Sequence, residues 1–412
     1  MPRKSNQTTI NQLPGLNSLR FFAALIVLIH HVYQLNYLFG LRSGPFPPAI
    51  LLMGQLGMIF FFVLSGFLIT YLLLEERENY GSISVRNFYI RRALRIWPIY
   101  YLVVLVGLFV LPHFHWFEIP RMSDGNGDGF GTKTAMYLLM APNLVMCFFK
   151  PFPGVAQTWS IGVEEQFYLL WPHLFRRIKS NKTILRIFFG IIALFLILPA
   201  LPPAAIERWP GSTKWFRLLG RFLSDEQFGC LSMGAVFAWL LKETSPKFLR
   251  SICNFFAFIA ATFLAIFLVW QDYRFPYASN EAYSILFGVI ILNVAANPDI
   301  SFPFRLRSLD FLGKLSYGIY MYHIAIVAFT IHFALDLKSQ GLLREEFFNV
   351  FVFIFALSVT IFVSWLSYRL IEVPFLRLKS SFAPDEIRKL KSKSSAFKKS
   401  KRASKAVSAP AK

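Results

Sequence analysis

The chain has 412 residues, of which 55% are hydrophobic and only 16% are charged. This composition excludes an ordinary soluble protein, because a soluble surface needs more charge. The formal net charge of +21 is compatible with nucleic-acid binding, but most lysines and arginines lie in short loops and in the C-terminal tail. That distribution is typical of membrane topology, so we expect a protein that contacts membrane lipids and binds no nucleic acid.

Apolar runs, each bounded by charges or by Pro and Gly clusters, recur along most of the chain. Many approach the roughly 20 residues that a helix needs to cross a bilayer. The ten candidate spans are 19–39, 50–74, 93–112, 159–176, 184–203, 222–241, 251–270, 280–296, 311–335 and 347–371. The sequence therefore predicts an all-α, polytopic membrane protein with about ten transmembrane helices.

An eleventh run at 134–149 is shorter, and Pro142 and Asn143 break it. If this run does not cross and the N-terminus is cytoplasmic, the cytoplasmic side carries 32 of the 43 lysines and arginines. Without the C-terminal tail, the cytoplasmic side still carries 19 lysines and arginines, and the other side carries 11. We therefore expect a re-entrant or interfacial segment at 134–149, with both termini in the cytoplasm.

Three regions follow from these patterns. Residues 1–15 are expected to form a cytoplasmic tail, and residues 16–376 the transmembrane domain. Residues 377–412 are rich in Lys, Ser and Ala and poor in large apolar side chains. Such a composition cannot bury a core, so a basic, disordered cytoplasmic tail is expected there.

The first candidate span contains two adjacent histidines, His30 and His31. His31 lies eleven residues after Arg20, which is about 16 Å along a helix and close to the middle of a bilayer. Burying imidazoles at that depth is costly. The pair serves either helix packing through hydrogen bonds or catalysis, in which one histidine takes a proton from an attacking hydroxyl.

The third span begins near Arg92 and Arg95, which are three residues apart and share a helix face. This spacing favours joint binding of a phosphate group, as in coenzyme A. Arginines at the cytoplasmic end of a helix are also simple topology determinants, and the sequence does not decide between the two.

The segment 159–168 brings Trp159, Ser160, Glu164 and Glu165 into the opening turns of another span. In the predicted topology these turns lie near the outer interface. A carboxylate inside a membrane segment indicates a functional site, although acids near a helix start also stabilise the helix dipole.

Two glycine-containing segments, 61–70 and 312–323, carry small residues that allow helices to pack closely. The second ends at His323, which either lines the same cavity as His31 or is a satisfied core histidine. The weaker candidates are Asp225, Glu226, Arg369 and Glu372. The cysteines Cys147, Cys230 and Cys253 have no metal-ligand spacing, so we expect them to pack in the core and expect no metal.

Five motifs of this sequence, in their order along the chain, resemble those of the acyltransferase-3 family of membrane O-acyltransferases. The first motif of the family is a basic residue, ten further residues and then a histidine, which falls on Arg20 and His31 and selects His31 over His30. Its Arg-x-x-Arg pattern falls on Arg92 and Arg95. The other three motifs fall on 61–69, 159–168 and 312–323, and the resemblance covers about residues 16–375.

The resemblance implies an enzyme of the bacterial plasma membrane that uses acyl-CoA as co-substrate and binds no further cofactor. An acyl group, most often acetyl in this family, would pass from the cytoplasmic side to a hydroxyl of a surface or lipid-linked glycan. His31 would act as general base with Arg20 and Glu164, and Arg92 and Arg95 would hold the coenzyme. The residues expected to contact substrate are Trp159, Ser160, Glu165 and His323.

Several alternatives stay open at this point. The hydroxyl attacks the thioester directly, or His31 is transiently acylated first. A proton-coupled transporter or flippase of a sugar or lipid-linked substrate would also bury His and Glu residues, but it predicts paired inverted repeats that the sequence does not display. The identity of the acceptor, the acyl group and the oligomeric state are not specified by the sequence.

Overall fold

The computed structural model describes residues 13, 15–41, 49–120, 122, 129–197, 226–275 and 278–379, together with 216, 218, 220, 222, 223 and 382. All regular elements in these ranges are helices. Residues 1–12 and 383–412 lie outside the described residues, so the expected tails at 1–15 and 377–412 stay predictions. Residues 377–379 form the end of the last helix.

The long helices are α1 Leu16–Leu38, α2 Ala49–Tyr80, α3 Val85–Phe109, α6 Trp159–Arg177, α7 Asn181–Ile197, α10 Phe228–Glu243, α12 Phe255–Trp270, α13 Ser279–Ala296, α15 Arg307–Ser339 and α16 Glu345–Ser367. The shorter helices are α4 Phe130–Leu138, α5 Pro142–Phe148, α11 Pro246–Ile252, α14 Pro298–Ser301 and α17 Val373–Lys379. A π-helix, Tyr368–Glu372, joins α16 to α17. Single 3₁₀ turns occupy Leu111–His113, His115–Phe117, Ala156–Thr158 and Pro303–Arg305.

Six of the described helices are long and apolar enough to cross a membrane, and α11 with α12, bent by 40°, makes a seventh candidate. A multi-pass membrane protein is therefore confirmed, whereas about ten spans are not. Each of the ten predicted runs falls on a helix where it is described, whereas 198–203 and 224–225, parts of two of these runs, lie outside the described residues. Of the remaining three, α6 carries acids and arginines, α10 has 16 residues, and α7 is described only as far as Ile197.

The helix ends sort into two groups. At one end, which we call the basic end, the Asn17 amide donates to Asp310 at 2.8 Å and so joins the starts of α1 and α15. Arg77 near the end of α2 donates to the carbonyl of Ile178 at 3.2 Å, between α6 and α7. The basic end therefore holds the starts of α1, α3, α7 and α15 and the ends of α2 and α6.

The opposite end is defined by a second set of contacts. Gln55 near the start of α2 donates to Asn280 at the start of α13, at 2.8 Å. Asn280 in turn donates to Gln227, just before α10, at 3.1 Å. Asn36 near the end of α1 donates to Asn349 near the start of α16 at 3.2 Å. The helices thus alternate in direction, as the charge pattern predicts.

The segment 134–149 does not form a continuous helix. Met140 has a positive φ of 58° between α4 and α5, and Pro142 begins α5. Because α3 begins and α6 ends at the basic end, residues 110–158 make no net crossing, which agrees with the expectation for this segment. Asn143 of α5 accepts from Gln166 of α6 at 3.0 Å, so the segment is packed against the bundle.

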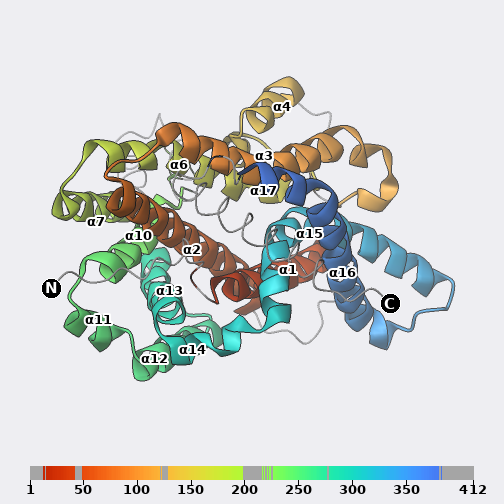
Figure 1. The fold of residues 1–412 in the computed structure, drawn as a ribbon. Coiled ribbons are helices and arrows are strands. Elements are labelled where there is room, and N and C mark those ends of the chain that lie inside the picture. Colours follow the sequence, from red (N-terminus) through yellow and green to blue (C-terminus); the bar gives the residue numbers. More distant parts are fainter. Residues whose placement is uncertain are drawn as a thin grey trace, which may run out of the picture.

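Helix α2 runs through the middle of the bundle, with α7 and α10 on one side and α15 and α16 on the other (Figure 1). Two glycines allow α2 and α10 to cross closely. A Cβ on Gly66 would collide with the Leu231 backbone, and one on Gly234 would collide with the Val63 backbone. The small residues of the 61–70 segment therefore serve helix packing.

Candidate functional site

The first cluster is a histidine pair between α1 and α15. The rings of His31 and His323 have centroids 4.8 Å apart, and His323 Nε2 lies 3.1 Å from His31 Nδ1. The helices approach closely because Gly313 of α15 faces the backbone of Asn17, where a Cβ would not fit. The structure thus brings together two histidines from predicted motifs nearly 300 residues apart.

Backbone carbonyls set the proton positions in this pair. The Tyr320 carbonyl lies 2.6 Å from His323 Nδ1, and the Val27 carbonyl lies 2.9 Å from His31 Nδ1. A carbonyl only accepts, so both neutral rings carry their proton on Nδ1, and His323 Nε2 accepts part of the His31 proton. His31 Nε2 is therefore the unprotonated nitrogen, and it has no hydrogen-bond partner among the described residues.

His30 is used differently from its neighbour. Its Nδ1 donates to the carbonyl of Ile50 on α2 at 3.1 Å, and its ring fills the space that a Cβ on Gly54 would occupy. His30 therefore takes the packing role that the sequence left open, and His31 keeps a free nitrogen.

Ser160 supports the pair through Tyr320. The Tyr320 hydroxyl donates to the Gln157 carbonyl at 2.6 Å, which leaves its oxygen to accept from Ser160 Oγ at 2.8 Å. Ser160 is buried and its hydroxyl is satisfied inside the protein. Ser160 is thus linked to His323 by Tyr320, which lies on α15 with His323. The expected contact of Ser160 with substrate stays a prediction.

The second cluster lies nearer the basic end and consists of arginines. Arg20, Arg92 and Arg95 are close enough to interact electrostatically with one another, and Lys379 of α17 interacts with all three. The Arg92 guanidinium lies 5.7 Å from the Phe88 ring centroid and 6.0 Å from that of Tyr168.

This cluster has unused hydrogen-bonding capacity. Arg92 Nε is buried without a hydrogen-bond partner among the described residues. Within the described residues, the side chains of Arg20, Arg92, Arg95 and Lys379 form no ion pair. Glu164 nevertheless lies within electrostatic reach of Arg20 and Arg92. A concentration of guanidinium groups of this kind is suited to phosphate oxygens.

Glu164 belongs to this second cluster. Ser65 Oγ and the Tyr168 hydroxyl both donate to its carboxylate at 2.7 Å, and Arg20 and Arg92 lie within electrostatic reach. Ser65 is about 24 Å along α2 from its start, near the middle of that helix. Glu164 therefore lies beside the middle of α2 and close to Arg20 and Arg92, and its expected position near the outer interface of the membrane stays a prediction.

The segment that precedes α6 determines the position of Glu164 in the bundle. Because α4, α5 and the turn at Ala156–Thr158 pack against the bundle before α6 begins, α6 starts inside it. Sequence reasoning also missed Ser65, Tyr168 and Tyr320 as partners. A hydroxyl in the apolar run before Gly66 would have indicated the first of them.

The two clusters are separate. The contacts of His31 are Val27, His30 and His323, and it contacts neither Arg20 nor Glu164 within the described residues. Along α1 the clusters are about 16 Å apart.

The other candidates lie around these clusters. Trp159 packs on Phe62 with ring centroids 6.0 Å apart, and Glu165 accepts from Trp97 Nε1 at 3.5 Å. Glu372 interacts electrostatically with Arg95. The other weaker candidates are Arg369, which covers the Trp365 ring, Glu226, which accepts from Asn143, and Asp225, which lies outside the described residues.

Comparison with known proteins supports the resemblance read from the motifs. The sequence profile of the acyltransferase-3 family, described as an acyltransferase domain, matches residues 13–369. Peptidoglycan O-acetyltransferase OatA of Listeria monocytogenes is 26% identical over 390 residues, 90% of this chain and 57% of that relative. O-acetyltransferase OatA of Staphylococcus aureus is 28% identical over 379 residues, 88% of this chain and 57% of that relative.

No solved structure matches the chain. The chain spans less than two thirds of the length of these two relatives. The family profile, however, covers most of the chain. The chain therefore belongs to the acyltransferase-3 family, and its apolar helices are those of a multi-pass membrane protein.

Proposed function

We propose that this protein transfers an acyl group, acetyl in the first instance, from acyl-CoA to a hydroxyl of a surface or lipid-linked glycan. The names of the two relatives support acetyl as the group, and one of those names supports a glycan acceptor. The observation that carries the mechanism is the unprotonated Nε2 of His31, whose ring is held by Val27 and His323.

The reaction follows from that nitrogen. His31 Nε2 takes the proton of the acceptor hydroxyl while the oxygen attacks the thioester carbonyl. The carbon–sulfur bond breaks, and the coenzyme A thiolate takes up the proton from His31. His323 keeps the Nδ1 proton of His31 in place, so that Nε2 stays the basic atom.

Donor binding is assigned to the arginine cluster. Arg20, Arg92, Arg95 and Lys379 supply positive charge for the diphosphate and 3′-phosphate of the coenzyme at the basic end, which the charge pattern assigns to the cytoplasm. The interval of about 16 Å along α1 is then bridged by the extended pantetheine arm, which brings the thioester to His31.

The test is transfer of label from radiolabelled acetyl-CoA to glycan in membranes that contain the protein, with mass spectrometry of surface glycans from the same cells. His31→Ala should lower the rate about 10²–10⁴-fold, the range for loss of a general base. His113→Ala, at an exposed histidine, is the matched control. Parental transfer by folded His31→Ala protein would refute the mechanism, and glycan export without label transfer would favour the transporter.

A further inference from the structure

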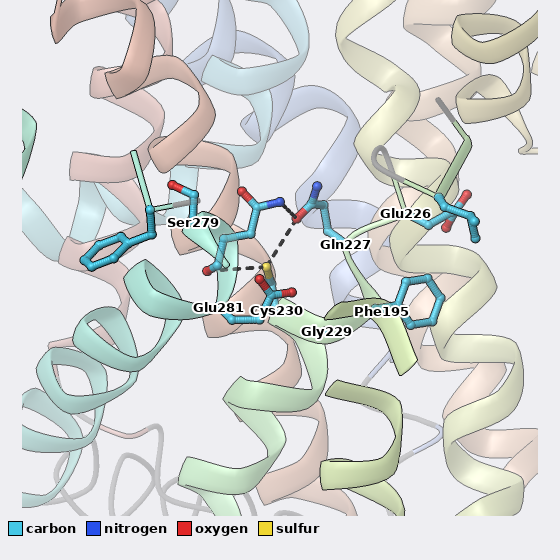
Figure 2. A pocket seen from close by; sticks show the side chains of 10 residues that line it. Phe195, Glu226, Gln227, Gly229, Cys230, Ser279 and Glu281 are labelled. Atoms are coloured by element: carbon cyan, nitrogen blue, oxygen red, sulfur yellow. Dashed lines mark hydrogen bonds between the residues drawn. The ribbon is translucent and has the colours of Figure 1, made fainter. Parts of the chain in front are cut away.

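The arginine cluster is reached from the basic end of the bundle. The cavity shown in Figure 2, which is lined by the starts of α10 and α13, lies at the opposite end and is not on this route. At the basic end, α17 packs against α3, the helix that carries Arg92 and Arg95 (Figure 1). A phosphate group that enters the cluster therefore meets α17.

Packing holds α17 only weakly. All seven of its residues are described, and none of them is buried. Phe375 and Leu378 are 38% and 55% exposed. A short helix with few buried contacts opens at a lower free-energy cost than the rest of the bundle. The position of α17 therefore depends on how its two ends are attached.

The first end of α17 follows the π-helix Tyr368–Glu372, which continues α16. Sharp bends in helices occur at π-helical turns, and such turns are frequent at functional sites. Glu372, the last residue of the π-helix, is buried and interacts electrostatically with Arg95. This end of α17 is thus suited to be a hinge beside the arginine cluster.

The second end of α17 is held by Arg91. One amino group of Arg91 donates to the Phe382 carbonyl at 3.1 Å. The other forms an ion pair with Glu76 at 2.8 Å, between side chains that are 15% and 9% exposed. The second oxygen of Glu76 accepts from the amide of Ser84 at 2.9 Å. Arg91 is therefore fixed to the turn between α2 and α3, and it holds the chain just after α17.

Lys379, the last residue of α17, completes the arginine cluster. It interacts electrostatically with four arginines, which are Arg20, Arg91, Arg92 and Arg95. Like charges at short range repel one another, so the cluster pushes α17 outward when no anion is bound. A bound phosphate reverses this effect, because it attracts Lys379 and the arginines together. Donor binding and closure of α17 therefore favour each other.

We propose that α17 is a lid over the phosphates of the donor and that Arg91 is the positioning residue that holds the lid closed. The assignment rests on the proposed function, because acyl-CoA is what brings phosphates to the cluster. Both amino groups of Arg91 are engaged within the protein, so Arg91 acts through Lys379. The lid admits the donor by opening at the π-helix, and it closes onto the bound phosphates.

The experiment uses the purified full chain in detergent, with acetyl-CoA as the varied substrate. Arg91→Lys keeps a cation beside Glu76 but loses the hydrogen bond to the Phe382 carbonyl. It should raise the KM for acetyl-CoA about three- to tenfold, the range for one hydrogen bond, with kcat unchanged. The KM for acetyl-pantetheine, which lacks the phosphates, should not change. Arg86→Lys, at an exposed arginine of the same helix, is the matched control.

A double variant separates the lid from a merely structural role of Arg91. Lys379→Gln alone should raise the KM for acetyl-CoA about tenfold, as expected for the loss of a charged partner of a phosphate. Because Arg91 acts through Lys379, Arg91→Lys should add less than about twofold in the Lys379→Gln background. Effects that multiply in the double variant would overturn the lid.

Hydrogen exchange of the amides of 373–379 gives an independent readout. Coenzyme A should slow this exchange and pantetheine should not, and Arg91→Lys should speed it in the free protein. Exchange that is equal with and without coenzyme A would overturn the lid alone, because saturable transfer from acetyl-CoA would still support the proposed function. Absence of any transfer from acetyl-CoA by the parent would overturn the proposed function, and the lid with it.

Discussion

At the scale of single residues, His31 is proposed to carry out the proton transfer, and the residues around it hold its ring in position. The family motif selected His31 over His30, and in the structure His30 donates to the Ile50 carbonyl, while the catalytic role of His31 stays a prediction. The role of His323 as a partner of His31 could not be read from sequence, because nothing in either motif specifies contact between α1 and α15. The contact of Tyr320 with Ser160 was likewise not predicted, because it joins α15 to α6.

His323 acts through His31 and is a positioning residue. His323→Leu removes the acceptor for the His31 Nδ1 proton and should lower kcat about tenfold, with little change in the KM for acetyl-CoA. His323→Gln restores an acceptor oxygen and should recover part of kcat. Steady-state kinetics on the folded variants checks this, and equal losses in both variants would contradict a proton-holding role.

We expect Arg92 to contribute to binding of the acyl-CoA donor and not to the acyl-transfer step. Loss of a charge-assisted hydrogen bond costs about 1.5–3 kcal/mol, so Arg92→Gln should raise the KM for acetyl-CoA about 10- to 100-fold. Acetyl-pantetheine lacks the phosphates, and its KM should not change. Arg86→Gln, at an exposed arginine of the same helix, is the control. A similar change for both donors would place Arg92 outside the phosphate site.

At the scale of helices, close packing depends on glycines in α2, α10 and α15. Sequence reasoning identified the small-residue segments at 61–70 and 312–323, and their packing use is confirmed at Gly66 and Gly313. It did not identify Gly234, whose partner is the Val63 backbone in a helix far away in sequence. Which glycine meets which backbone is a property of the assembled bundle.

Gly234→Ala should destabilise the protein, because the added Cβ meets the Val63 backbone and cannot be relieved by a rotamer change. Gly190→Ala is the natural comparison, since its Cβ meets nothing within 4 Å, and alanine in a helix interior gains about 0.5–1 kcal/mol over glycine. Thermal unfolding in detergent should show a lower midpoint for the first variant and an equal or higher one for the second. A similar midpoint for both would mean that the α2–α10 crossing relaxes easily.

At the scale of the whole molecule, the alternation of helix direction was predictable, because positive charge marks one side of a membrane irrespective of packing. The depth of α6 was not predictable. The distribution of charge predicts the side of the membrane on which a loop lies. It does not predict how far α4 and α5 enter the bundle before α6 begins. The contact of Glu164 with Ser65, near the middle of α2, was therefore not predicted although the motif of Glu164 was recognised.

The two ends of the bundle can be checked by cysteine labelling. In a variant without native cysteines, Ser180→Cys at the basic end and Gln340→Cys at the end of α15 should react with a membrane-impermeant maleimide from opposite faces of the membrane. Ser180→Cys should label in inverted vesicles and Gln340→Cys in right-side-out vesicles. Labelling of both from one face would contradict the alternation of helices.

The spacing of eleven positions from Arg20 to His31 also limits the length of the donor that α1 can accommodate. Any acyl carrier whose phosphate is anchored at Arg20 must present its carbonyl about 16 Å away. Acetyl phosphate, in which the two groups are adjacent, is too short to satisfy both positions. It should not replace acetyl-CoA as donor even at high concentration, whereas other thioesters on the same pantetheine arm have the required reach.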